Sequence, residues 1–546
     1  MMEKDVLLFT GGTILTMTEE MYAEGVVVKN NRITFVGSLD QCREVAGQNY
    51  EVIDLQGQCL VPGFIDPHVH VMMLGMCNTW ADISYEKVKN MDNLVNVLKE
   101  HEKTLPEGAP IRGFGFDKRK LEEQRYPTSK DLDRVATDRP VQIMNSSGHC
   151  NVVNTYLLDL IGIKPDTPDP IGGSFGRNQD GFPNGTLFDS ANDYLAQQFG
   201  VRPGNHGPNI HMPDTQDNLQ KNIEIGQDLL LSAGFTTVND VQVTKQEMES
   251  YLHARDNGLL KIRIELSFLS NYLDDIKKMG ICSRFGEDQL TMGSLKLYAD
   301  GSLISGTAYL STDYADHERT KGYLFHDPEE FKNILIEAHK YGLQTLTHAQ
   351  GDGAIELVLQ AVETAQKECL RPDIRHRIEH CGLPTKEQVR RIAELEIWPV
   401  PQPQHVYLYG NGVVEAIGQE GENYSPYGWF KENGIPIVLS SDTPVAFPNA
   451  FEAIYAAITR NTAQGNIVGL EHKIELEEAL KGYTIEAAKT IHKEHLVGSI
   501  EKGKLADFAI LDKNPYHDKE EDLIKISVNE TWISGKRVFI REKVIG

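Results

Sequence analysis

The sequence lacks the features that mark several large classes of protein. It contains no hydrophobic stretch long enough to span a bilayer. Its first residues, MMEKDVLLFTGG, include acidic side chains where a signal peptide carries basic ones, and their apolar run is short. The seven cysteines are an odd number, widely scattered and without a Cys-x-x-Cys pair. We therefore expect a soluble, cytoplasmic protein with reduced thiols rather than a membrane protein or a disulfide framework.

Positive charge is also scarce. Lysine and arginine number 54 against 79 aspartates and glutamates, which gives a net charge of −25. Such a surface repels nucleic acids and anionic membranes, so we expect neither as a partner. The 546 residues exceed the size at which one hydrophobic core stops growing, which predicts a large domain with at least one satellite. The oligomeric state stays open, and a homodimer is one option.

Strand-like and helix-like segments alternate along most of the chain. The strand-like segments are apolar and β-branched, and several of the helical patterns between them begin at Asp, Thr or Pro and end at Gly. This alternation predicts an α/β fold, a parallel (β/α)8 TIM barrel, with a doubly wound open sheet as the alternative. The eight predicted strands are 59–66, 234–241, 261–268, 293–300, 343–349, 374–380, 396–403 and 435–442.

Two regions fall outside this repeat. Residues 71–233 separate the first two predicted strands by far more than an ordinary connection, so we expect an inserted subdomain over the barrel mouth. Short strands and turns mark both ends of the chain, which predicts one small composite β-sandwich made of residues 1–58 and 495–546. The barrel with its insertion would then occupy residues 59–494.

Ionisable side chains gather at the predicted strand ends. In a parallel barrel the functional residues lie at the C-terminal ends of the strands, and residues two apart on a strand point the same way. Single residues have structural explanations: a histidine can cap a carbonyl, Lys296 can pair with Asp300, and Asp442 can cap a helix. The occurrence of several such residues at the same end of the predicted barrel favours a metal site, because imidazoles and carboxylates suit Zn²⁺ or a similar ion. The candidates are His68 and His70 after the first strand, Lys296 in the fourth, His348 and His380 at the ends of the fifth and sixth, and Asp442 at the end of the eighth.

This arrangement of motifs resembles the amidohydrolase superfamily. The shared features are H-x-H after PGFID, lysine on strand four, histidines on strands five and six, and aspartate on strand eight. The segments VGSIEKGKLADFAILD, DGSLISGTAYL and HAQGDGAI resemble more narrowly its YtcJ-like branch, which includes N-substituted formamide deformylases. The resemblance runs essentially from end to end.

The resemblance implies a site for one or two divalent ions, most often Zn²⁺. His68, His70 and Asp442 would hold the first ion, and His348 and His380 the second. Lys296 would react with CO₂ to form a carbamate that bridges the two. A plain lysine is otherwise a poor ligand, because its ammonium is protonated near neutral pH.

The implied activity is hydrolysis of a C–N bond in a small molecule by metal-activated hydroxide. The bond would be of amide, cyclic amide or N-formyl type, and Asp442 would move the proton. Two alternatives remain. The same ligands could serve a decarboxylation or an isomerisation, or the chain could be a non-catalytic scaffold, although such a relative would be expected to have lost ligands.

Three further residues lie near these strand ends. His149, in the loop QIMNSSGHCNVVN, is expected to contact substrate, because similar segments of the branch lie near the pocket; the alternative is a structural loop histidine. Asp240 is either a site residue or a helix cap. Glu379 precedes His380 and should point to the opposite face of the strand, so we place it outside the site. Aromatic residues in PQPQHVYLYGNG could line the mouth or pack on the surface.

Overall fold

A parallel sheet curled into a nearly closed barrel forms the centre of the molecule. The computed structural model describes residues 6–196, 215–315 and 321–542. The barrel strands hydrogen-bond in the order β21-β20-β19-β18-β16-β15-β8, and the short β17 (Phe285–Gly286) pairs antiparallel with β18. This is the α/β barrel that the alternation predicted. The strands are β8 (Phe64–Val69), β15 (Phe235–Val243), β16 (Arg263–Leu269), β18 (Leu290–Tyr298), β19 (Gln344–Ala349), β20 (Arg377–His380) and β21 (Trp398–Val400).

The eighth predicted strand, 435–442, lies beside β8 but forms no regular ladder. Its end is tied to β8 by two backbone bonds, from Asp442 N to His68 O and from His70 N to Thr443 O, both 3.0 Å. The prediction of a regular strand was wrong because Pro436 has no N–H to donate and Asp442, with φ 57°, leaves the extended region. The barrel closes at this seam through few bonds.

The first predicted strand, 59–66, is two strands. β7 (Cys59–Pro62) joins a six-stranded sheet with the order β24-β23-β22-β7-β2-β3, and only β8 enters the barrel. Gly63 lies between them, where a Cβ atom would come within 2.3 Å of the Thr236 side chain. The chain can therefore turn here only with glycine, a constraint that a run of apolar residues does not reveal.

Helices cover the outside of the barrel, and their ends follow the expected capping chemistry. Asp327 accepts the N–H groups of Glu329 and Glu330 at the start of α10, which ends at left-handed Gly342. Thr244, not Asp240, caps α8, so Asp240 is not a helix cap. The principal helices are α7 (Gln216–Ser232), α8 (Lys245–Asp256), α9 (Leu273–Met279), α10 (Pro328–Tyr341), α11 (Asp352–Glu368), α12 (Lys386–Glu394), α13 (Pro403–Ile417), α14 (Tyr427–Glu432) and α15 (Ala450–Thr459).

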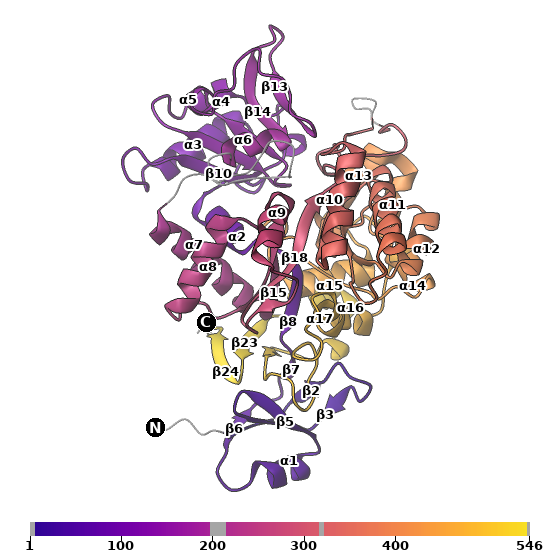
Figure 1. The fold of residues 1–546 in the computed structure, drawn as a ribbon. Helices are drawn as coiled ribbons and strands as arrows, with labels where there is room; N and C mark the ends of the chain where they lie inside the picture. Colours follow the sequence, from indigo (N-terminus) through magenta and orange to yellow (C-terminus); the bar gives the residue numbers. More distant parts are fainter. Residues whose placement is uncertain (1–5, 197–214, 316–320, 543–546) are drawn as a thin grey trace.

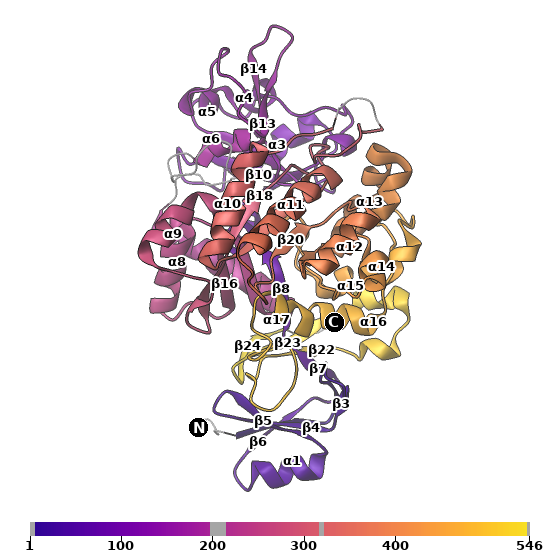
Figure 2. The same cartoon turned by 45° about the vertical axis from the view of Figure 1, so that its right-hand side comes forward.

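The segment between β8 and β15 carries a sheet of its own. Its strands have the order β13-β14-β12-β11-β10-β9. Figures 1 and 2 show this subdomain at one end of the barrel and the sheets made from the chain ends at the other. The strands are β9 (Ala81–Asp82), β10 (Ile111–Phe116), β11 (Val141–Asn145), β12 (Cys150–Val153), β13 (Gly173–Arg177) and β14 (Pro183–Asp189).

The sheets below the barrel combine both ends of the chain. β2 (Thr13–Leu15) and β3 (Tyr22–Ala23) share a sheet with β22 (Phe508–Leu511), β23 (Val528–Ile533) and β24 (Lys536–Ile540). A second sheet packs against the first through Phe9, whose ring contacts Phe508 and Trp532. Its strands have the order β5 (Arg32–Gly37), β4 (Gly25–Lys29), β1 (Val6–Thr10) and β6 (Glu51–Asp54). Among the described residues, every helix is too short or too polar to cross a membrane.

Candidate metal centre

Two imidazoles and one carboxylate meet where β8 ends. The Nε2 atoms of His68 and His70 each lie 3.3 Å from Oδ1 of Asp442, and all three side chains are buried. The backbone bond from Asp442 N to His68 O fixes the carboxylate beside the two rings. Burial alone would raise the pKa of Asp442, but the neighbouring His68 and His70 outweigh it and hold this pKa well below its ordinary value.

Glu379 belongs to this centre, contrary to our expectation. Its carboxylate accepts a hydrogen bond from Nδ1 of His68, and Arg377 holds it through Nε and Nη2, both at 2.7 Å. Strict alternation fails here because His380, with φ 68°, is not extended, so Glu379 and His380 both reach the centre. Burial alone would raise the pKa of Glu379, but Arg377 and His68 lower it to about 2. An ionised Glu379 requires the proton on Nδ1, which leaves the lone pair of His68 on Nε2 for a ligand.

His348 and His380 are oriented in the same way. His348 donates from Nε2 to Gly301 O at 2.9 Å, and His380 donates from Nδ1 to Oε1 of Gln402 at 2.7 Å. The amide nitrogen of Gln402 donates to Val400 O and to Ser440 Oγ, so its oxygen must face His380. Burial lowers the pKa of both imidazoles well below the ordinary value. Each ring is therefore neutral and keeps one lone pair, and the ring centroids lie 4.4 Å apart.

Lys296 is buried at the same centre without a hydrogen-bond acceptor for Nζ among residues 6–196, 215–315 and 321–542. Its ammonium lies 4.6 Å from the Tyr298 ring centroid. Burial lowers the pKa of Lys296 to about 8, against the opposing effect of Glu379 and Asp442. Asp300 instead accepts the backbone N–H groups of Tyr309, Gln350 and Gly351, so the alternative of a Lys296–Asp300 ion pair does not hold.

His405 is a residue that the sequence reasoning missed. It lies in the first turn of α13, after β21, and its Nε2 is 3.8 Å from Oδ2 of Asp442. Neither of its ring nitrogens has a hydrogen-bond partner in the part of the chain that the structure describes. His380, His405 and Asp442 form a second set whose ligand atoms lie within 4.8 Å of one another. A search that extended one helical turn beyond each strand end would have found it in PQPQHVY.

His149 extends from the subdomain to the centre. It lies between β11 and β12, and its ring centroid is 5.4 Å from that of His348. Its Nδ1 atom is 2.5 Å from Oδ1 of Asp189. The structure thus brings the six predicted ligands and His149 to one end of the barrel.

The donor set fits a divalent transition metal. Two ligand sets share Asp442, one with His68 and His70 and the other with His380 and His405. Imidazoles together with an ionised carboxylate are the ligands that zinc prefers in proteins, and the second ring nitrogens of His68 and His380 are each held by an acceptor.

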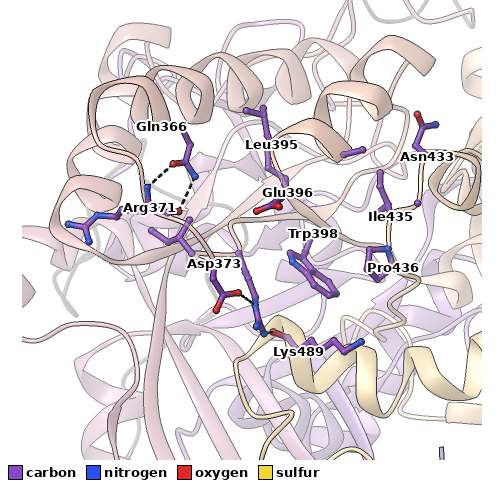
Figure 3. Close-up of a pocket in the computed structure, with 15 residues that line it drawn as sticks. Gln366, Arg371, Asp373, Leu395, Glu396, Trp398, Asn433, Ile435, Pro436 and Lys489 are labelled. Carbon is purple, nitrogen blue, oxygen red and sulfur yellow. Dashed lines mark hydrogen bonds and ion pairs between the residues drawn. The ribbon is translucent and has the colours of Figure 1, made fainter. Parts of the chain in front are cut away.

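A separate cavity of about 440 Å³ lies where β20 and β21 begin, at the other end of the barrel (Figure 3). Trp398 forms part of its wall, and Arg375 is paired with Asp373 at 2.5 Å and with Glu494 at 2.8 Å. Its described lining residues include no histidine or cysteine. This cavity therefore lacks the imidazoles that characterise the metal centre.

Comparisons with known proteins agree with this geometry. The chain is 27% identical to the N-substituted formamide deformylase of Arthrobacter pascens, over 97% of this chain and 98% of that protein. It is 29% identical to the protein YtcJ of Bacillus subtilis (strain 168), over 97% and 99%. An uncharacterised metal-dependent hydrolase from Pyrococcus horikoshii OT3 has a similar structure, with a TM-score of 0.76, 26% identity, and coverage of 94% of this chain and 99% of that one.

The pattern that defines the amidohydrolase family matches residues 51–539, which is nearly the whole chain. The resemblance to the YtcJ-like branch that the sequence motifs predicted is thereby confirmed. This chain belongs to the amidohydrolase family of metal-dependent hydrolases.

Proposed function

We propose that this protein hydrolyses a C–N bond of a small molecule, of amide, cyclic amide or N-formyl type. The observation that carries the proposal is the pair of Nε2 atoms at 3.3 Å from Asp442 Oδ1, because such a set serves a metal-dependent hydrolase. The name of the Arthrobacter pascens relative, a deformylase of N-substituted formamides, supports a C–N bond next to a carbonyl.

The proposed ligands are His68, His70, Lys296, His348, His380 and Asp442, with Zn²⁺ as the ion. One or two bound ions would lower the pKa of water and polarise the substrate carbonyl. Lys296 would be carboxylated, and its lowered pKa supports this, since only a neutral amine reacts with CO₂. With a pKa of about 8, roughly one lysine in ten is neutral near pH 7.

Asp442 would carry the proton. Its Oδ1 faces His68 and His70, whereas Oδ2 is turned toward His405 at 3.8 Å and can accept a proton. Water would lose a proton to Asp442 as its oxygen bonds to the carbonyl carbon. The same proton would then pass to the nitrogen as the C–N bond breaks, giving a carboxylic acid and an amine. His149 would contact the substrate from the subdomain side.

The metal assignment is tested by anomalous diffraction at the zinc edge, combined with metal analysis of the purified protein. We expect peaks within about 3 Å of the proposed ligands. A protein that holds no divalent ion after addition of zinc and bicarbonate would contradict the assignment.

The bond type is tested with the zinc-loaded protein on a panel of N-formyl amines, linear amides, cyclic amides and matched esters. We expect release of amine from at least one amide class, and loss of that release in Asp442→Asn. Glu396→Gln is the matched control, because Glu396 lines the cavity at the other end of the barrel. Turnover of esters alone would contradict the proposal.

A further inference from the structure

Three side chains link the subdomain to the barrel at the metal centre. Asp189, at the end of β14, contacts Nδ1 of His149 through Oδ1 at 2.5 Å. Its other oxygen accepts a hydrogen bond from the hydroxyl of Tyr323, which lies in the barrel loop between β18 and α10. Asp189 has no exposed surface. Both oxygens of one buried carboxylate are thus engaged, one by the imidazole and one by the barrel.

The backbone around this contact is held as firmly as the side chains. The N–H of Asp189 donates to His149 O at 2.9 Å, and Nδ2 of Asn192 donates to the same oxygen at 3.1 Å. Ser147, two residues before His149, shares a 2.9 Å hydrogen bond with Ser305 of the barrel. His149 is therefore fixed from the subdomain and from the barrel at the same time.

Asp189 holds a backbone conformation that other residues avoid. Its φ of 50° and ψ of −119° fall in a region that glycine populates and that costs other residues about 1–3 kcal/mol. Glycine would relieve this strain but would supply no carboxylate. An aspartate kept here points to a requirement for its side chain.

The geometry defines what His149 offers to a ligand. Nδ1 faces the carboxylate of Asp189 and donates to it, so in the tautomer that makes this bond the lone pair lies on Nε2, on the opposite side of the ring. The ring lies 5.4 Å from His348, between the subdomain and the metal ligands. In this tautomer His149 presents a hydrogen-bond acceptor at Nε2.

We propose that Asp189 and Tyr323 are positioning residues that hold His149 as an acceptor for an N–H group of the substrate. The inference rests on the proposed function and narrows it to amides and formamides whose nitrogen keeps a hydrogen. An analogue with a fully substituted nitrogen has the same carbonyl but leaves Nε2 of His149 without its donor.

The test is a double-mutant cycle with Asp189→Gly, His149→Ala and the double variant, each measured on an N–H amide and its N-methyl analogue. We expect Asp189→Gly to lower kcat/KM for the N–H amide at least tenfold. In the His149→Ala background it should change the rate less than about twofold, because Asp189 acts through His149. The N-methyl analogue should respond to neither substitution. Metal content should stay at the wild-type value throughout.

Tyr323→Phe provides a second route to the same result. It keeps the ring and removes only the hydroxyl that holds Asp189, so a loss in the same direction is expected even if Asp189→Gly fails to fold. Losses that multiply in the double variant, or an equal loss on the N-methyl analogue, would overturn the inference while leaving C–N hydrolysis intact. A zinc-loaded wild type that cleaves no amide would overturn the proposed function and this inference with it.

Discussion

Asp442 connects the two ligand sets through its two carboxylate oxygens. Oδ1 lies 3.3 Å from both His68 and His70, and Oδ2 lies 3.8 Å from His405. One side chain can therefore bind a cation with one oxygen and accept a proton with the other. Its low pKa makes it an anion in the working range of pH, which both tasks require.

Replacement of Asp442 by asparagine should separate these two tasks. Asp442→Asn keeps the shape and a carbonyl oxygen but cannot accept the proton, so turnover should fall at least about 10², the low end for loss of acid–base catalysis. Metal content by elemental analysis should remain near that of the wild type. Wild-type turnover with unchanged metal would show that another group carries the proton, with His149 the first candidate.

We expect activity to require the carbamate of Lys296 and not the positive charge of its side chain. We expect Lys296→Ala to lose activity and short carboxylic acids to restore part of it, because they supply the missing anionic oxygens. Lys296→Arg should stay inactive, since a guanidinium remains protonated and cannot form a carbamate. The rescue is checked by measuring initial rates of Lys296→Ala at increasing concentrations of acetate or propionate. Full activity of Lys296→Arg would refute the bridging role.

At the scale of elements, a chain of buried histidines joins α10 to the start of β20. Thr345 N donates to Nδ1 of His376, so the proton of His376 is on Nε2. That nitrogen lies 2.8 Å from Nδ1 of His339, whose own Nε2 lies 2.6 Å from Cys369 O. The chain of bonds is complete only when both rings are neutral. Burial lowers the pKa of both, that of His376 to about 3.

This pair should make the protein less stable in acid. The pKa values of the folded state lie below the unfolded value of about 6.5, so the unfolded chain takes up protons first as the pH falls. Stability is therefore lost as the pH falls below about 6.5, and His376 contributes about 1.4 kcal/mol per pH unit to this loss until the pH approaches its pKa of about 3. His376→Gln should reduce the slope of the unfolding free energy by that amount. Urea titrations of metal-free protein between about pH 7 and pH 5 measure it.

His253→Gln is the matched control for this slope. His253 is an exposed histidine on α8, so its removal should leave the pH dependence unchanged. Equal slopes for the wild type and His376→Gln would mean that His376 does not stay neutral in the folded protein.

At the scale of the whole molecule, a buried ion pair fastens the barrel to the sheet made from the chain ends. Arg263, at the start of β16, bonds both oxygens of Asp507, with Nε at 2.9 Å and Nη2 at 3.2 Å. Asp507 also accepts the N–H of Ser534 at 2.7 Å. Both charged side chains are nearly inaccessible, so neither can turn to water if its partner is removed.

Removing one partner should therefore cost far more than removing both. Arg263→Met leaves a buried carboxylate unpaired and should lower the free energy of unfolding by about 3–5 kcal/mol. The double variant Arg263→Met with Asp507→Asn should regain more than half of this, since no buried charge is left. The free energies of unfolding of the wild type, Arg263→Met and the double variant, measured by denaturant titration, test this prediction.

An exposed pair offers the comparison. Arg134→Met breaks the surface contact with Asp92 and should cost less than about 1 kcal/mol, because both groups are solvated. A cost for Arg263→Met as small as that for Arg134→Met would show that Asp507 is protonated or reached by water in the folded protein.

The sequence by itself determined the barrel and the six candidate ligands. Parallel strands bring their carboxyl ends to one edge, so residue type and position in the repeat suffice to gather these six residues at one end of the barrel. His68 and His70 are two residues apart on one strand and therefore point in the same direction. This inference needs no information about distant segments. These inferences depend on local periodicity, which a single sequence displays.

Only the tertiary structure decided which residues support that set. Glu379 and His68 are 311 residues apart, and the positive φ of His380, which ends the alternation of the strand, lets His380 reach the same centre as Glu379. Asp189 and Tyr323 meet only because the subdomain lies on the barrel mouth, and His405 is brought in by the first turn of α13. Positive φ values within a strand, and contacts between segments far apart in the chain, produce no periodic pattern in the sequence. Local patterns therefore cannot reveal them.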